Sequence, residues 1–144
     1  MEAMQQLLIE RECARLVALY CHYVDHGEAV RIAELFAEDG VWRGLGIEMT
    51  GLSQLRKGFA ERQANEGRMS RHVCNNLVID LIDERAAVGT VYLTLYNHDG
   101  EKGRSTSPLE GPVAVGEYRD RFVLTDQGWR FAERDTRLSF VRRT

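Results

Sequence analysis

Two short stretches of the sequence hold side chains suited to moving a proton. The first runs from Tyr20 to Gly27 and carries the carboxylate of Asp25 among two histidines and two tyrosines. The second surrounds His72. An imidazole titrates near neutral pH, and an adjacent carboxylate fixes its tautomer and stabilises the imidazolium formed on proton abstraction. If the protein is a catalyst, we expect Asp25 to orient His72, which would act as the general base.

Asp25 also has a purely structural interpretation. It stands three residues before Glu28, which is the spacing of a capping box at the start of a helix, and Asp is among the best N-cap residues. The apolar helix face that precedes it leads from Ala14 through Ala18 and Cys21 to Asp25, a setting that tends to raise a carboxyl pKa. The residues alone favour the capping role.

His72 presents a similar choice. Taken alone, a histidine on a strand is more often a satisfied polar residue than a catalyst. Side chains alternate between the faces of a strand, and the apolar residues Leu77 and Ile79 have the opposite parity to His72. A bulge near Asn75-Asn76 would reset that parity. Otherwise both faces of the strand would have to be covered.

Four further residues are candidates for binding a substrate. The hydroxyl of Tyr20 could polarise a substrate oxygen, although aromatic residues on a helix are most often core. Trp42 and Tyr92 fit either a pocket wall or the core. Arg134 could anchor an acidic group or pair at the surface with an acidic neighbour such as Asp135.

The sequence gives little reason to expect a metal. His22 and His26 flank Asp25 and lie four residues apart. A catalytic zinc needs a third protein ligand and usually a Glu base at a set spacing, and the sequence provides neither. We therefore expect neither a metal nor a cofactor.

The length of the sequence favours one domain spanning residues 1–144, and its charge and cysteine content bear on its partners and its compartment. A chain of 144 residues can bury a core, and a net charge of −3 without a basic stripe gives no reason to expect nucleic acid. The 3 cysteines are odd in number and form no CxxC pair, which favours a reducing compartment over a disulfide framework. Without a signal peptide or a bilayer-spanning run, we expect a cytoplasmic protein with no membrane partner.

The first half of the chain is expected to be mainly helical. Apolar residues recur at helical spacing in three segments, and Gly27 and Asp39-Gly40 interrupt them. A short strand at Val41-Trp42 opens a loose, glycine-rich hairpin. The expected helices are Glu2 to Val24, Glu28 to Glu38, and Leu52 to Asn65.

From Ser70 onward the pattern changes to strands. Three β-branched-rich runs are followed by a last strand, and polar residues 97–111 form one long loop. Helices followed by a meander predict an α+β fold, in which a bent, mainly antiparallel sheet wraps three helices and encloses a pocket. Apolar residues are expected on both faces of the strands, so the outer face of the sheet would need cover as well as the inner one. This predicts a homo-oligomer, with a dimer favoured, that uses the outer face of the sheet. The expected strands are Val73–Ile82, Ala86–Tyr96, Val113–Leu124 and Trp129–Phe140.

Nearly the whole chain resembles the SnoaL-like proteins of the nuclear transport factor two superfamily, which include polyketide cyclases, scytalone dehydratase and hexachlorocyclohexane dehydrochlorinase. The order and spacing of several short motifs carry the resemblance. They are Tyr20-(four residues)-Asp25, Ala33 to Trp42, His72 with Asn75-Asn76-Leu77, Gly116-Glu117-Tyr118, and Gly128-Trp129-Arg130.

The resemblance implies a cone-shaped fold with an internal pocket. It also implies a cofactor-independent lyase that acts on a small apolar cyclic molecule, with Asp25 and His72 as the catalytic dyad and Trp42 and Arg134 in the pocket. The steroid isomerase branch fits less well, because its general-base aspartate would fall near Gly44. The alternative is a non-catalytic ligand-binding or accessory subunit, such as the small subunit of an aromatic-ring dioxygenase.

Overall fold

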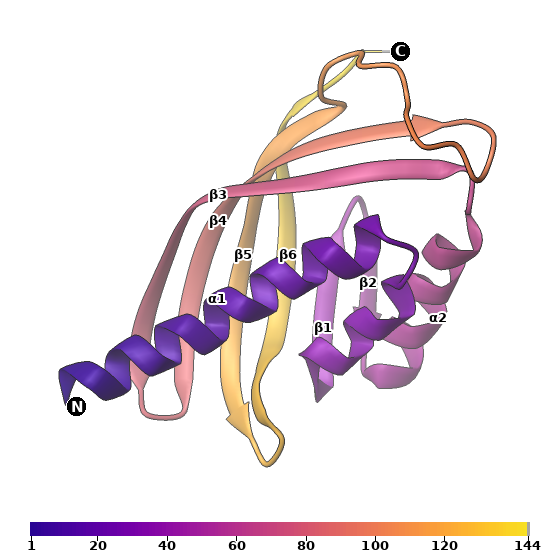
Figure 1. Ribbon diagram of the computed structural model, residues 1–144. Helices are drawn as coiled ribbons and strands as arrows, with labels where there is room; N and C mark the ends of the chain where they lie inside the picture. The colour runs from indigo at the N-terminus through magenta and orange to yellow at the C-terminus, as the bar shows by residue number, and fades with distance from the viewer. Residues whose placement is uncertain (144) are drawn as a thin grey trace.

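Three helices cover one face of a six-stranded sheet in the computed structural model, which describes residues 1–143 (Figure 1). The helices are α1 (Ala3–Asp25), the 3-10 helix η1 (Ala29–Leu35) and α2 (Leu52–Ala64). The strands are β1 (Phe36–Gly44), β2 (Ile47–Thr50), β3 (Arg68–Asp83), β4 (Ala86–Asp99), β5 (Ala114–Thr125) and β6 (Gly128–Val141). The expected α+β class is confirmed.

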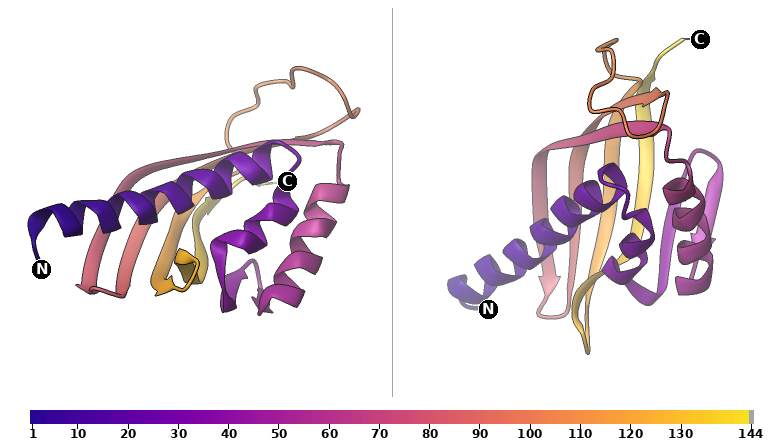
Figure 2. Two further views of the ribbon diagram at one scale, coloured as in Figure 1. Left: turned by 60° about the horizontal axis from the view of Figure 1, so that its bottom comes forward. Right: turned by 45° about the vertical axis from the view of Figure 1, so that its right-hand side comes forward.

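Helix α1 crosses the concave face of the sheet (Figure 2). Its buried residues recur every three or four positions, which makes one continuous stripe against the core. The stripe consists of Ile9, Cys13, Leu16, Val17, Tyr20 and Val24. None of the helices in residues 1–143 has both the length and the apolar content needed to cross a membrane.

The sheet is mixed rather than purely antiparallel. Its strand order is β2-β1-β6-β5-β4-β3, and β1 pairs in parallel with β6 while the other neighbours are antiparallel. The sheet is strongly curved but not closed (Figure 1, Figure 2). This agrees with the expected bent, mainly antiparallel sheet and the cone shape.

The second helix is shorter than the sequence predicted. It ends at Leu35, and the chain enters β1 at Phe36 instead of continuing in a helix to Glu38. Phe36 pairs with Phe131 of β6, and their rings lie 5.1 Å apart. The helical pattern is overridden because this pairing buries Phe36 in the core, a tertiary contact that local spacing does not reveal.

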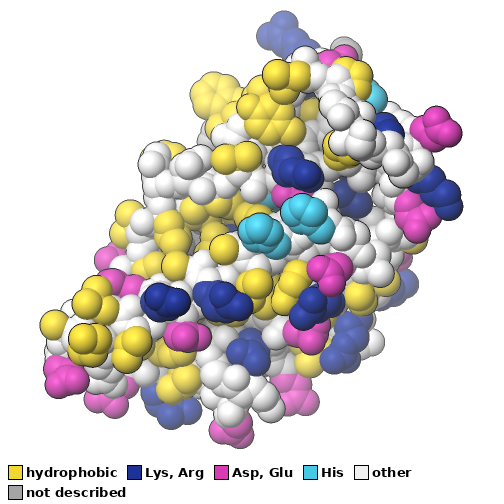
Figure 3. Space-filling model, in the orientation of Figure 1, with side chains coloured by type: hydrophobic (Ala, Val, Ile, Leu, Met, Phe, Trp, Pro, Cys, Tyr) yellow, Lys and Arg dark blue, Asp and Glu magenta, His cyan; other side chains and the backbone are white. Residues whose placement is uncertain are grey.

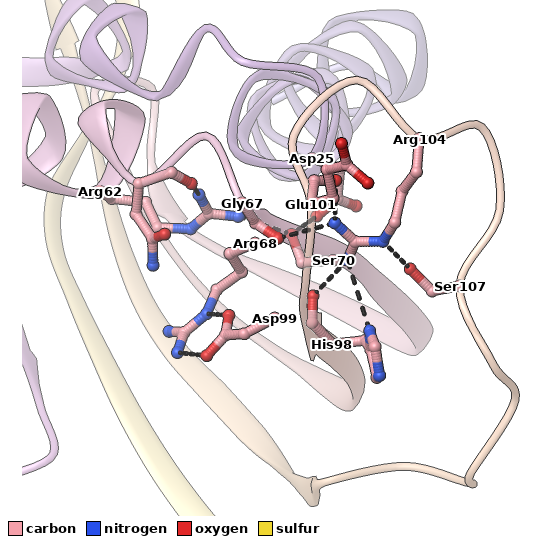
Figure 4. Close-up of polar contacts among 11 residues, drawn as sticks. Asp25, Arg62, Gly67, Arg68, Ser70, His98, Asp99, Glu101, Arg104 and Ser107 are labelled. Carbon is pink, nitrogen blue, oxygen red and sulfur yellow. Dashed lines mark hydrogen bonds and ion pairs between the residues drawn. The ribbon is translucent and has the colours of Figure 1, made fainter.

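The Arg104 side chain makes several of the hydrogen bonds that anchor the segment 100–113 between β4 and β5. The Arg104 guanidinium donates to the carbonyl oxygens of Gly67, His98 and Glu101 at 2.9, 2.7 and 2.8 Å, and to the hydroxyl of Ser107 at 2.9 Å (Figure 4). Strand β4 continues to Asp99, so the loop begins later than expected. Arg104 therefore fixes this loop to the start of β3, near the end of α1.

Candidate active site

Asp25 and His72 are in direct contact, as the sequence predicted. His72 Nδ1 lies 2.7 Å from Asp25 Oδ1, and the His72 backbone N–H donates to Asp25 Oδ2 at 2.8 Å. The two side chains are only 5% (Asp25) and 12% (His72) exposed. An ionised carboxylate can only accept, so Nδ1 carries the proton of the neutral ring and Nε2 keeps the free lone pair. This tautomer suits a general base.

Two residues that the sequence did not single out complete the support of Asp25. Ser70 Oγ donates to Asp25 Oδ1 at 2.8 Å, and Arg62 donates to Ser70 Oγ at 3.1 Å. Figure 4 shows these three side chains side by side, brought together from α2, β3 and the end of α1. Both oxygens of Asp25 are thus bound by β3, which excludes the capping role. Ser70 could have been noticed by its parity, since it precedes His72 by two positions.

A bulge in β3 brings His72 to the inner face. The β3–β4 register shifts between Asn75 and Val78, and Asn76 has a left-handed backbone with φ of 59°. An extra residue at this point reverses the side-chain alternation. His72 and Leu77 therefore both face α1, despite their opposite parity in the sequence. Of the two alternatives left open by the sequence, the bulge is the one observed.

Asp25 is held as an anion. Burial raises the pKa of its carboxyl, but the hydrogen bonds and charge of His72 and the hydrogen bond from Ser70 outweigh burial, so the pKa lies below its usual value. A fixed negative charge behind Nδ1 stabilises an imidazolium and so strengthens His72 as a base.

Tyr20 and Trp42 form a second polar contact next to the dyad. The indole Nε1–H of Trp42 donates to the Tyr20 hydroxyl oxygen at 3.0 Å, and the Tyr20 ring centre lies 6.4 Å from that of His72. Burial raises the pKa of Tyr20 to about 12, although the charge of Arg134 opposes the rise. Tyr20 therefore stays a phenol at neutral pH and retains its own proton for donation.

Arg134 lies in the interior and does not pair at the surface. Its side chain is 0% exposed and binds both oxygens of Asp120, at 2.9 and 3.2 Å. Its guanidinium carbon also lies 4.3 Å from the Tyr20 ring centre and 3.6 Å from that of Tyr118. Sequence reasoning missed Asp120, although the inward parity of β5, shared with Tyr118, signals its position.

Tyr92 is separated from the other candidate residues, which corrects the expectation that it lines the pocket. Its neighbours Val91 and Leu93 are buried, whereas Tyr92 is 53% exposed on the outer face of β4. The alternation along a strand requires this separation, because a residue between two inward-facing ones must point outward.

Two cavities approach the dyad from different sides. One of about 310 Å³ is lined by His72, Cys74 and Leu77 of β3 and by Ala14, Ala18 and Cys21 of α1. The other, about 750 Å³, is lined by Asp25, Arg62, Arg71 and Arg104 among others. The dyad thus separates a mostly apolar cavity, reached by His72, from a polar one, reached by Asp25.

The remaining histidines near the dyad lie outside it. His22 and His26 stack with ring centres 5.7 Å apart, and His26 Nδ1 lies 2.8 Å from the His22 carbonyl oxygen. Figure 3 shows histidine side chains close together on the surface of the molecule, on the side where α1 lies. Within residues 1–143, no three His, Cys, Asp or Glu side chains converge as metal ligands would.

Several solved structures have a fold similar to that of this chain. A candidate scytalone dehydratase from Novosphingobium aromaticivorans is 22% identical with a TM-score of 0.82, over 98% of this chain and 91% of that one. A hexachlorocyclohexane dehydrochlorinase, LinA type 2, is 13% identical with a TM-score of 0.80, over 98% and 92%. Rv3472 of Mycobacterium tuberculosis, a protein of unknown function, is 24% identical with a TM-score of 0.76, over 98% and 78%.

At these identities the likeness establishes the fold, which is NTF2-like and cystatin-like, as in a further neighbour from Novosphingobium aromaticivorans that is 23% identical. A family model for the SnoaL-like domain matches residues 5–135, and the chain belongs to that family. Sequence comparison with curated proteins finds no match.

Proposed function

We propose that this protein is a cofactor-independent lyase that eliminates a small leaving group from an apolar cyclic substrate. The observation that carries the proposal is the contact between His72 and Asp25 at the edge of an apolar cavity. At about 310 Å³, the cavity falls at the small end of the range for ligand sites, which suits a molecule of one or two rings.

The proposed reaction begins with proton abstraction. Nε2 of His72 takes a proton from a substrate carbon, and the electron pair of that C–H bond becomes a carbon–carbon double bond. The leaving group departs from the adjacent carbon with its own bonding pair. Asp25 stabilises the imidazolium, which then returns its proton to the leaving group or to solvent. The substrate loses one molecule of HX, where X is hydroxide or halide.

Two further residues would act on the developing negative charge. The Tyr20 hydroxyl can donate to a substrate oxygen, and Trp42 fixes its orientation. Arg134 supplies a permanent positive charge against the Tyr20 ring, and its Nη1 is buried with no hydrogen-bond partner among residues 1–143. Positive groups fixed in advance stabilise charge that develops in a transition state.

The relatives support this reaction class. A dehydratase removes water and a dehydrochlorinase removes hydrogen chloride, and structures bearing these names have the same fold. Both names describe an elimination, which is the reaction that a positioned base and an electrostatically stabilised leaving group serve.

The test is a substrate panel. Purified protein would be incubated with scytalone, hexachlorocyclohexane isomers, and simpler cyclic β-hydroxy ketones and halocyclohexanes, and the products identified by mass spectrometry. We expect loss of water or hydrogen halide from at least one class, abolished in His72→Ala and retained in His98→Ala. If the wild type bound panel members but turned none of them over, the lyase proposal would be overturned.

A second candidate is a non-catalytic ligand-binding or accessory subunit. The observation that favours it is the filled interior, where Tyr20, Phe59, Tyr118, Phe131 and Arg134 pack together. Such a subunit would bind a small apolar molecule or a larger partner, and His72→Ala would leave its function unchanged.

We further propose that the outer face of the sheet forms a homodimer interface. Large apolar side chains are exposed on β3 and β4, including Val73 at 42%, Val78 at 57% and Tyr92 at 53%. Light scattering at micromolar concentration should give the dimer mass. Tyr92→Glu should shift the mass toward the monomer, whereas Leu109→Glu, in the loop, should not. A wild-type monomer would contradict the proposal.

A further inference from the structure

Two cysteine side chains meet at the wall of the smaller cavity. The sulfur atoms of Cys21 on α1 and Cys74 on β3 lie 3.5 Å apart, although 53 residues separate them in the chain. Both side chains are partly exposed, and both line the cavity that His72 reaches. The elimination proposed above uses neither thiol.

We propose that Cys21 and Cys74 form a reversible thiol–disulfide site, with a small-molecule disulfide such as oxidised glutathione as its oxidant. The bond would tie α1 to β3 across the cavity wall, two residues from His72. Its formation is independent of any catalytic activity, while its effect on turnover rests on the function proposed above.

The geometry requires little movement. A disulfide holds its sulfur atoms about 2.05 Å apart, so the two sulfurs must approach by about 1.5 Å. Rotation of two short side chains on elements that already pack together can provide this. The third cysteine offers an internal control, because Cys13 is 0% exposed in the core and burial raises its pKa to about 12.

The exchange proceeds in two balanced steps. The Cys74 thiolate attacks one sulfur of oxidised glutathione, which forms a mixed disulfide and releases one glutathione thiolate. The Cys21 thiolate then attacks the Cys74 sulfur and releases the second. Both cysteines are oxidised, one glutathione disulfide is reduced to two thiols, and the two thiol protons end on glutathione. Cys74 is the better attacking group, because a hydrogen bond from Cys21 lowers the pKa of Cys74.

The bond should alter the site as well as the fold. Cys74 follows His72 on the same inner face of β3, and Cys21 lies one helical turn before Asp25 on α1. The cross-link therefore joins the two elements that carry the dyad, at the surface a substrate would touch. We expect lower turnover in the oxidised protein and its recovery with dithiothreitol.

The experiment treats the full chain with oxidised glutathione, then unfolds it and alkylates the remaining thiols, and maps the peptides by mass spectrometry. We expect a Cys21–Cys74 cross-linked peptide, one alkylated thiol at Cys13, and a melting temperature higher by about 5–10 °C, since a long closed loop stabilises the fold. Cys13→Ser should behave like the wild type. Cys21→Ser should stop at a glutathione adduct on Cys74, with no rise in melting temperature.

Peptide mapping does not depend on turnover, so it separates this proposal from the lyase. A protein without activity on any substrate would still give the cross-link if the thiol site is correct. Three outcomes would overturn the site: a stable glutathione adduct in the wild type, cross-links only between molecules, or no reaction at either cysteine.

Discussion

Two side-chain pairs, each of a nitrogen base and a carboxylate, lie between α1 and the sheet, and they differ in nearly every physical respect. His72 and Asp25 sit at the rim, with side chains 12% and 5% exposed, beside open cavities. Arg134 and Asp120 are both 0% exposed within aromatic rings. Imidazole can gain and lose a proton near neutral pH, whereas guanidinium cannot. The rim pair is suited to moving a proton and the buried pair to holding a fixed charge.

The pairs also differ in how completely their polar atoms are bonded. Asp25 accepts from Ser70 and from both the backbone and the ring of His72. On β6, by contrast, Arg134 Nη1 and Thr136 Oγ1 are buried without a partner among residues 1–143. Buried polar atoms are nearly always hydrogen-bonded. The region around Arg134 and Thr136, here called the arginine side, therefore has the less complete hydrogen bonding of the two.

The largest expected effect is kinetic and falls on the rim pair. Loss of a positioned general base lowers the rate about a hundredfold to ten-thousandfold, so His72→Ala should reduce kcat by that factor on the substrate found by the panel. The free energy of unfolding should fall by about 1.5–3 kcal/mol, the contribution of a hydrogen bond to a charged group. Urea unfolding, measured alongside the kinetics, separates the loss of catalysis from the loss of stability. If the kcat of His72→Ala were within threefold of the wild-type value, the proposed difference in role between the two pairs would be lost.

The next effect is on stability and falls on the buried pair. Arg134→Met leaves Asp120 buried without its partner, which should cost about 3–5 kcal/mol of unfolding free energy. The double variant Arg134→Met/Asp120→Leu should recover most of that loss. Arg137→Met is the matched control, since Arg137 lies on the same strand, 55% exposed, and its pair with Asp135 should contribute under about 1 kcal/mol. Equal losses in Arg134→Met and Arg137→Met would show that burial does not distinguish them.

A third test uses pH. The pKa of Asp25 in the folded protein lies below its usual value, because its hydrogen bonds outweigh burial. A depressed carboxyl pKa contributes stability that is fully present above the unfolded value, near pH 4, and is lost as the pH falls through the folded value. Unfolding measured from pH 6 down to pH 2 should show a smaller acid loss in Asp25→Asn than in the wild type. Asp126→Asn, at an exposed turn, should follow the wild-type curve.

Much of the fold could be predicted from the sequence, because periodicity reports local burial. Helix α1, helix α2 and the four long strands were located within a few residues, and family resemblance paired Asp25 with His72. The predicted helix to Glu38 and the placement of Tyr92 in the pocket were wrong. The helix is cut short by the parallel pairing of β1 with β6, and Tyr92 points outward because it alternates with the buried Val91 and Leu93 along β4.

The polar partners were the hardest part of the site to predict. Ser70 and Asp120 are short polar residues of ordinary type, and strand parity indicates only the face on which each lies, not the partner that it binds. Each becomes meaningful only when a strand places it opposite a charge from a distant segment, 45 residues away for Ser70 and Asp25. The bulge at Asn76 was predictable only as one of two alternatives, since a left-handed residue in a strand leaves no periodic signal.

The smallest expected effect tests whether the arginine side is incomplete in the free protein. The Thr136 hydroxyl is buried and lacks a partner among residues 1–143, so removing it in Thr136→Val keeps the shape and removes an unsatisfied group. The free energy of unfolding should stay unchanged or rise by up to about 1 kcal/mol. Thr125→Val is the matched control with the opposite sign, because Thr125 Oγ1 donates to the Gly128 carbonyl at 2.8 Å and accepts from the Gln127 N–H at 3.2 Å. That variant should lose about 1 kcal/mol. If chemical denaturation finds equal losses in both, the Thr136 hydroxyl is already satisfied, and the arginine side is not incomplete.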